Sequence, residues 1–404
     1  MKSEKTIVRE LRGLIGLIGL MILIGCSKDE AAGPMTEKSS EVQLASYVAS
    51  YEEAKKGNEA NEANRAYRAY EAYGAYEPTR GWIPPSGYSM FEDSEQPISV
   101  FFTQDHDVPV GGYEERFFFT NSGQWRVNGN EITAGTYYFY GYVPHDKSIT
   151  TTVSVLPGDG KTYAHGAVLS LNNVPTVSPA DFCVMIAAKN GKDDYNANAD
   201  YSVTGLQRGH FEYVAPGGGN NYVFLLFDHL FSALRLRMRV QGDYNALRTI
   251  KLKELKLKTY AGETATKKKT NITITLTANN EGNDPITNVT FTPTGEDTEA
   301  GSVFTSETGF ELNEDYQEFT GHFMPQGVTT VILESTYDVY DKKDNLVRQG
   351  CTAINTLDLG KLFSGQHEAL RGRRYSINLT INPTYLYVLS EPDLNSPDVT
   401  IDDN

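Results

Sequence analysis

Short runs of β-branched and aromatic residues recur between residues 98 and 188, separated by Gly, Asn, Asp and Pro. Such runs are typical of strands, and the residues between them are typical of turns. The runs that we expect to form strands cover residues 98–102, 116–120, 125–127, 136–143, 151–156, 165–171 and 182–188. Their spacing predicts an antiparallel β-sandwich or a barrel.

A second set of strand signals follows residues 217–221, Gly-Gly-Gly-Asn-Asn. Residues 234–240 alternate strictly, with apolar residues at the even positions and arginines at the odd ones. This pattern predicts a strand with one buried face and one basic, solvated face. We expect further strands at residues 222–227, 271–277, 328–334, 336–341 and 375–381, which together predict a second β-sandwich. The glycine-rich stretch is the candidate boundary between the two domains.

One predicted strand changes phase along its length. Ile250 and Leu252 share one parity, whereas Leu255 and Leu257 share the other. Because the side chains of a regular strand alternate between its two faces, a single unbroken strand cannot bury all four. We therefore predict a β-bulge near residues 253–254.

Residues 26–80 follow a different pattern. They are polar and acidic at first, and from Glu41 they are rich in alanine and compatible with a helix. A tyrosine then recurs at every third position from Tyr67 to Tyr76. We interpret residues 26–80 as a tether followed by an Ala/Tyr-rich segment that is partly helical or disordered. The tyrosines either form a stripe that packs or binds a partner, or belong to a low-complexity spacer.

The first 25 residues have the order of an export signal. Basic residues come first, an uncharged apolar run covers residues 14–25, and Cys26 follows. The run is shorter than the roughly 18–20 residues that a helix needs to cross a bilayer, so it predicts a signal peptide rather than an anchor. Residues 23–26, Leu-Ile-Gly-Cys, resemble a bacterial lipobox, in which Cys26 is acylated and becomes the first residue. A cysteine placed there by chance is the alternative. The next residues, Ser-Lys-Asp-Glu, resemble the tag that directs some Bacteroidetes lipoproteins to the cell surface.

The net charge limits the kinds of partner that the chain can bind. The formal net charge is −16, and the signal peptide carries four basic and two acidic residues, so the remaining chain is still more acidic. Such a charge repels nucleic acid and anionic membrane surfaces, so we expect membrane attachment only through acyl chains and no nucleic-acid partner.

Cys183 and Cys351 are too few for a disulfide scaffold. Cys183 lies in an apolar run and is expected to be a buried small hydrophobe.

The sequence carries no common enzyme signature. It has no His-Glu-x-x-His, Gly-x-Ser-x-Gly, glycine-rich phosphate loop or Cys-x-x-Cys. We therefore expect no catalytic residue, no cofactor and no metal. His229 follows an apolar run and is expected to be a core histidine rather than a ligand. A glycosidase that uses two carboxylates is a weaker hypothesis.

Two polar patterns have an alternative functional interpretation. Residues 194–200 place oxygen-bearing side chains at every second position, as the first half of a calcium loop does. Ala199 stands where that loop needs glycine and Gly205 where it needs glutamate, so a polar hairpin loop is expected. The arginines of residues 234–240 and the lysines of residues 251–258 could bind an anionic polysaccharide. A solvated face that discourages edge pairing is the expected role.

Several segments, taken in their order along the chain, are similar to the fimbrillin family of Bacteroidales. These are Cys26, Thr-Arg-Gly-Trp at residues 79–82, Trp125, and residues 135–144, 223–235 and 372–387. The resemblance extends from about residue 80 to the C-terminus. It implies two tandem transthyretin-like antiparallel β-sandwich domains, at residues 81–219 and 220–404, in a surface-exposed subunit of a fimbria at the outer membrane.

The resemblance also implies how subunits assemble. In that family a trypsin-like protease cuts after an arginine and removes an N-terminal segment whose strand had filled a groove. The C-terminal strand of a neighbouring subunit replaces it by β-augmentation, which gives a head-to-tail polymer. On this chain Arg80 is the preferred cleavage site, followed by Arg68 and Arg65. The donor strand would consist of Thr384, Tyr385, Leu386, Tyr387, Val388 and Leu389, and residues 399–401 could extend it.

The main expectation is therefore a non-enzymatic structural or adhesive fimbrial subunit. Its partners would be other subunits, the outer membrane through acyl chains, and a host or bacterial surface ligand. One alternative is a lipid-held fimbrial anchor that is not cleaved, because no strong strand signal stands just before Arg80. The other is a surface glycan-binding lipoprotein of a polysaccharide-uptake system, for which the 25 tyrosines would supply aromatic side chains.

Overall fold

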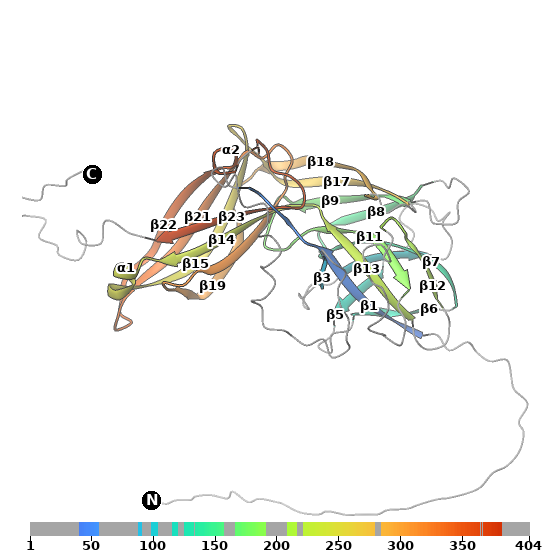
Figure 1. Ribbon diagram of the computed structural model, residues 1–404, viewed down its shortest axis with the longest axis horizontal. Coiled ribbons are helices and arrows are strands. Elements are labelled where there is room, and N and C mark those ends of the chain that lie inside the picture. Colours follow the sequence, from blue (N-terminus) through green and yellow to red (C-terminus); the bar gives the residue numbers. More distant parts are fainter. Residues whose placement is uncertain are drawn as a thin grey trace, which may run out of the picture. The chain divides into compact units, whose positions relative to one another are not determined.

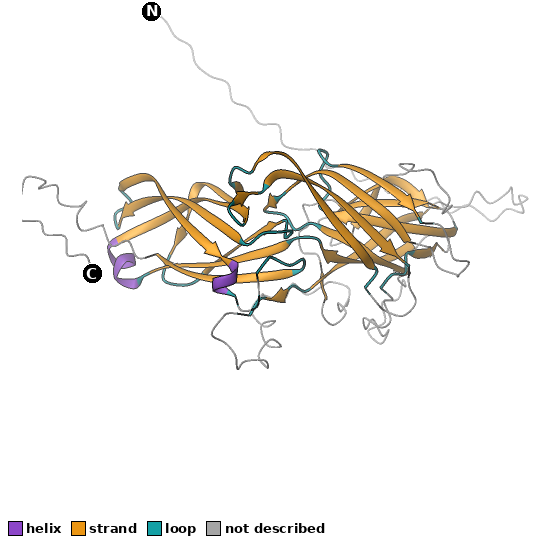
Figure 2. Ribbon diagram, turned by 90° about the horizontal axis from the view of Figure 1, so that it is seen from above, coloured by secondary structure: helices purple, strands orange, loops and turns teal. Residues whose placement is uncertain are grey.

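The computed structural model of the chain describes residues 40–55, 88–90, 98–103, 115–119, 125–132, 134–156, 166–190, 208–215, 221–278, 284–363, 365 and 367–381. All of them belong to one compact unit, Glu37–Asn404. Within these residues the chain forms 23 strands and two short helices, so the expected all-β fold is confirmed (Figures 1 and 2). Neither helix in the described part has the length and apolar character that a membrane crossing needs.

Nine strands form the largest sheet. They are β1 (Ser40–Ala49), β3 (Tyr88–Met90), β4 (Ile98–Thr103), β5 (Glu115–Phe119), β6 (Trp125–Ile132), β7 (Gly135–Val143), β11 (Cys183–Asn190), β12 (Glu212–Ala215) and β13 (Asn221–His229). Neighbours pair in the order β11-β13-β1-β6-β5-β4-β7-β12, and β3 pairs with β1. Because β11 also pairs with β7, the strands from β11 to β7 form a closed ring.

The two faces of this sheet pack into different cores. On β13, Leu225 and Phe227 belong to one buried cluster together with Ile98, while Leu226 between them belongs to another. This follows from the period of two along a strand. The second cluster also contains Leu169 and Ile274 from a four-stranded sheet. That sheet has the order β18-β17-β9-β8 and consists of β8 (Thr150–Val155), β9 (Gly166–Pro175), β17 (Lys267–Thr277) and β18 (Ile286–Asp297).

Two five-stranded sheets share a third core. The first has the order β10-β20-β14-β23-β2, with β2 (Glu52–Glu53), β10 (Val177–Ser178), β14 (Ser232–Val240), β20 (Gln317–Phe323) and β23 (Arg373–Ile381). The second has the order β16-β15-β21-β22 with β19 beside β15, and consists of β15 (Arg248–Ala261), β16 (Thr264–Ala265), β19 (Gly301–Leu312), β21 (Thr330–Asp341) and β22 (Leu346–Asp358). Leu234 and Leu333 illustrate how both sheets contribute to one buried cluster. The helices α1 (Gly242–Leu247) and α2 (Leu359–Leu362) follow β14 and β22.

The local patterns predicted burial correctly in this third core. The apolar residues of β14 are buried, and the arginines between them are half-buried. The register of β15 shifts between Leu252 and Glu254 against both β19 and β21, which confirms the predicted bulge. The shift lets Leu252 and Leu255 be buried although their sequence positions differ in parity.

The glycine-rich stretch at residues 217–221 does not divide the cores. β12 before it and β13 after it both belong to the nine-stranded sheet, and β17 further along the chain pairs with β9. A division at 219/220 therefore does not coincide with the division between the buried clusters. The physical reason is that glycines mark a turn, and a turn joins strands of one sheet as readily as it joins domains.

Residues 40–55 are extended rather than helical, which corrects the interpretation of this part of the tether. They form β1 and β2, and we call residues 40–55 the inserted segment. The alanines and serines of this stretch are compatible with a helix, but the strands on both sides of β1 supply partners for its backbone. Pairing of this kind overrides a weak local preference.

Candidate functional site at the inserted segment

β1 lies inside the nine-stranded sheet and is paired along both edges. It runs parallel to β13, from Val42 opposite Asn221 to Val48 opposite Phe227. On its other edge it pairs antiparallel with β6 and then with β3. In Figure 1 the blue β1 lies alongside β13. An N-terminal strand therefore separates two strands that come much later in the chain.

The inserted segment contacts two of the buried cores. Tyr47 is buried in the cluster between the nine-stranded and four-stranded sheets. Ala54, seven residues later, is buried in the third core. Between them, β2 pairs parallel with β23, and the amides of Glu52 and Ala54 each donate to a carbonyl beside or on that strand, at 2.9 Å. The segment thus joins parts of the molecule that other strands build separately.

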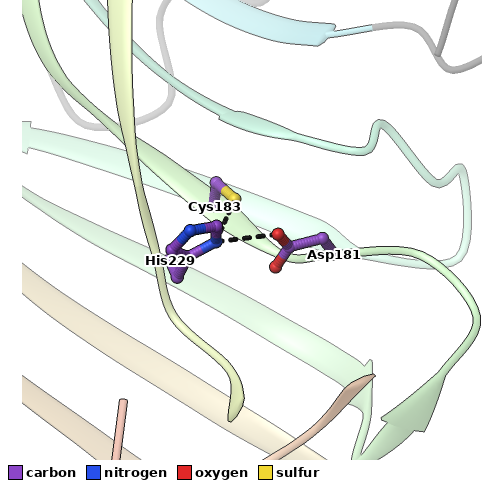
Figure 3. A group of neighbouring side chains, drawn as sticks. All are labelled: Asp181, Cys183 and His229. Atoms are coloured by element: carbon purple, nitrogen blue, oxygen red, sulfur yellow. Dashed lines mark hydrogen bonds and ion pairs between the residues drawn. The ribbon is translucent and has the colours of Figure 1, made fainter. Parts of the chain in front are cut away.

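A polar cluster holds the turn between β1 and β2. His229, the last residue of β13, is only 2% exposed. Its Nε2 lies 2.5 Å from the carbonyl oxygen of Ala49, and its Nδ1 lies 2.7 Å from Oδ2 of Asp181. Figure 3 shows Asp181 and Cys183 approaching the ring of His229. The expectation of a core histidine with satisfied nitrogens is confirmed.

The hydrogen bonds assign a charge to this histidine. A carbonyl oxygen accepts only, and a carboxylate oxygen accepts only, so both ring nitrogens of His229 donate and the ring is an imidazolium. Burial raises the pKa of Asp181, but the nearby His229 and His322 have the larger combined effect and lower it to about 2. Asp181 is therefore a carboxylate and neutralises the buried ring.

Tyr51 covers this ring from the inserted segment. Its ring stacks on His229 with centroids 3.5 Å apart and an interplanar angle of 16°. It also stacks more distantly on His322 of β20, at 6.1 Å. Burial, and after it the charge of Asp181, raises the pKa of the Tyr51 hydroxyl. That hydroxyl faces Asp181 without a hydrogen bond of normal geometry, so the face of the ring makes the closest contact.

Asp181, Cys183 and His229 lie close enough together to suggest a metal site. One ligand atom from each lies within 4.8 Å of the others. However, both nitrogens of His229 already donate hydrogen bonds, and burial followed by Asp181 raises the pKa of the Cys183 thiol. A metal needs a neutral imidazole and a thiolate. The donor set therefore fits a hydrogen-bonded cluster better than a metal ion.

The other candidate residues have different outcomes. Cys26, Arg65, Arg68, Arg80, the loop at 194–200, and Thr384, Tyr385, Leu386, Tyr387, Val388 and Leu389 lie outside the described residues. Cys183 is buried, as expected, and both Cys183 and Cys351 are free. The arginines of β14 make contacts within the chain, since Arg235 and Arg237 pair with Glu318 and Arg239 lies over the ring of Tyr316. That pairing favours a solvated face over a polysaccharide site.

Sequence reasoning missed the inserted segment. The signal that could have found it is the alternation at residues 42–48, where apolar Val42, Leu44 and Val48 share one parity. Its partner strands could not be read from the sequence, because β13 lies about 180 positions further along the chain, as the Ala49 to His229 hydrogen bond illustrates.

Comparison with known proteins finds similarity only to solved structures. No protein-family model and no curated protein matches the chain. The chain is similar to a candidate cell adhesion protein from Bacteroides uniformis ATCC 8492, with 11% identity, coverage of 86% of this chain and 94% of that chain, and a TM-score of 0.36. It is also similar to a fimbrial protein from Bacteroides ovatus ATCC 8483, with 9% identity, 85% and 50% coverage, and a TM-score of 0.28. It is also similar to the fimbrial anchor protein Mfa2 from Porphyromonas gingivalis, with 8% identity, coverage of 84% of this chain and 90% of that chain, and a TM-score of 0.22.

Proposed function

We propose that this chain is a non-enzymatic structural or adhesive subunit of a cell-surface fimbria. It is exported as a lipoprotein on Cys26 and is held at the outer membrane through acyl chains. A protease then cuts the chain between the inserted segment and the rest, and a neighbouring subunit supplies a replacement strand. The observation that carries the proposal is the position of β1, which fills the space between β13 and β6.

The order of the chain supports cleavage after the inserted segment. The described part of the segment ends at residue 55, and the next described strand, β3, begins at Tyr88. The candidate sites Arg65, Arg68 and Arg80 all lie between these positions. A cut at any of them separates β1 and β2 covalently from every later strand of the described part.

Loss of the inserted segment would create a strong acceptor for a strand. β13 would lose β1 as its partner over Val42 to Val48, and β6 would lose β1 as the partner of the edge that faces β13. Exposed backbone donors and acceptors along two facing edges bind an extended chain by β-augmentation. The aromatic and aliphatic run Tyr-Leu-Tyr-Val-Leu at residues 385–389 suits such a groove, and a tail donated by the next copy gives a contact that does not close.

Intact mass and N-terminal sequencing of the native protein test this proposal. Protein sheared from the cell surface and protein left in the membrane are compared, together with an Arg65→Ala, Arg68→Ala, Arg80→Ala triple variant. A shed species that starts directly after one of these arginines, and forms ladders on a gel without boiling, supports the proposal. The triple variant should then stay monomeric. A single acylated species that starts at Cys26 and is never shed would contradict strand exchange and leave the role of an uncleaved anchor.

A further inference from the structure

The cluster around His229 has the properties of a receptor for an aromatic ring. His229 comes from β13, Asp181 precedes β11, and His322 lies on β20, so none of them belongs to the inserted segment. They are also held by contacts that do not involve that segment. Asp181 bonds to Nδ1 of His229, and Nδ1 of His322 lies 3.1 Å from the carbonyl of Pro179. The site therefore persists when the inserted segment leaves.

Departure of the inserted segment would leave this site unsatisfied. Nε2 of His229 would lose the Ala49 carbonyl as an acceptor, and the face of the ring would lose Tyr51. A buried charged donor without an acceptor is costly, and a cation gains by stacking on an aromatic face. A replacement strand consequently has to supply a backbone carbonyl and a ring at the same place.

The inserted segment shows which spacing the site accepts. Tyr47 fills the core and Tyr51 fills the histidine site, four residues apart, with the end of β1 at Ala49 between them. In the tail, Tyr385 and Leu389 have this spacing. A tail that ran in the direction of β1 would need an apolar residue four positions before its tyrosine. For Tyr387 that position is Pro383, and for Tyr385 it is Ile381, which already belongs to β23.

We propose that the His229–Asp181–His322 site is the specificity-determining receptor for Tyr385 from the tail of a second copy, with the donor strand running opposite to β1 and Leu389 at the place of Tyr47. This inference rests on the proposed strand exchange. Recognition is mainly through the ring face, because the Tyr51 ring stacks directly on His229, whereas its hydroxyl faces the Asp181 carboxylate without a hydrogen bond of normal geometry. Phenylalanine at position 385 would therefore serve as well as tyrosine.

A displacement experiment tests the receptor. A sequence-specific protease site is inserted after Gly57 in the mature full-length chain, purified in mild detergent, so that the inserted segment can be cut off whether or not the natural site is used. The probes are synthetic peptides of residues 382–404, either unchanged or with Tyr385→Ala, Tyr385→Phe or Tyr387→Ala. Native mass spectrometry follows loss of the N-terminal fragment and binding of each peptide. Parallel measurements use His229→Gln, with the exposed His367→Gln as matched control.

The expected result is a binding constant at least about fivefold weaker for the Tyr385→Ala peptide and unchanged within about twofold for Tyr385→Phe. The His229→Gln chain should lose the difference between the unchanged and Tyr385→Ala peptides, while His367→Gln should keep it. If the unchanged and Tyr385→Ala peptides bind equally well, or if Tyr387→Ala is the damaging change, the receptor assignment is wrong. If the unchanged peptide does not bind at all, the strand-exchange function itself fails. The peptide series, measured on the chain with His229 intact, tests the receptor assignment even if the His229→Gln chain does not fold.

Discussion

The two strands of the inserted segment are held in different ways. β1 is a ten-residue strand with partners on both edges, and it buries Tyr47 in a core. β2 is a two-residue strand at the end of its sheet, and its side chains form ion pairs at the surface. Backbone pairing and apolar burial therefore hold one end, and charge holds the other. Release of the segment should begin at β2, because exposed ion pairs contribute little.

The largest effect should come from the buried end of the segment. Tyr47→Ala removes a ring that is 2% exposed and leaves a cavity, so we expect a loss of about 3–5 kcal/mol in the free energy of unfolding. Urea unfolding measures it. Leu346→Ala on the exposed part of β22 is the control and should change stability by less than about 0.5 kcal/mol. A loss below about 1 kcal/mol for Tyr47→Ala would mean that β1 contributes little to the folded state.

An intermediate effect should come from acid acting on the polar cluster around His229. The pKa of Asp181 is about 2 in the folded chain and near 3.8 when unfolded. The carboxylate therefore stabilises the fold fully above about pH 4, and this contribution is lost as the pH falls through about 2. The loss should be on the order of 2 kcal/mol.

Unfolding of the wild type and of Asp181→Asn, followed between pH 5 and pH 2, isolates this contribution. The stability of the wild type should fall more steeply, and the two curves should approach each other in acid. Parallel curves over the whole range would show that Asp181 does not hold the imidazolium of His229 in place.

The smallest effect should come from the charged end. Glu52 contacts Arg373 at 2.8 Å and Glu53 contacts Arg374 at 2.6 Å, and the Glu52 side chain is 71% exposed. Replacing both glutamates by glutamine should cost less than about 1 kcal/mol for each pair, and high salt should reproduce much of the loss. Hydrogen exchange at the amides of Glu52 and Ala54 should accelerate while exchange in β1 stays slow. Equal acceleration in both strands would show that they open as one unit.

Local patterns predicted much of the fold because the alternation of apolar and polar residues along a strand indicates which of its faces is buried. Alternation over Leu234 to Val240 gave the correct buried face, and the change of parity between Leu252 and Leu255 gave the position of the bulge. Strands with weaker alternation, such as β18 and β22, were not expected, since most of their side chains are exposed and carry no apolar period. The two runs at 328–334 and 336–341 fall largely in one strand, β21.

The candidate site was only partly predictable for a related reason. The sequence placed His229 in a core and Cys183 in a buried run, and both are buried. It did not indicate that Asp181, Tyr51 and His322 would surround the same ring, since these residues come from strands and turns far apart in the chain. A composition rich in alanine also concealed β1.

The sequence by itself determined that this is an acidic, strand-rich chain whose first 25 residues have the pattern of an export signal, and it determined which residues of its regular strands are buried. These properties depend on the order of neighbouring residues. Only the tertiary structure decided that the inserted segment lies between β13 and β6, that β17 returns to β9, and that a charged histidine holds the carbonyl of Ala49. The physical reason is that the hydrogen bonds of a sheet join backbones regardless of side chain, so the choice of partner depends on how the whole chain closes its cores.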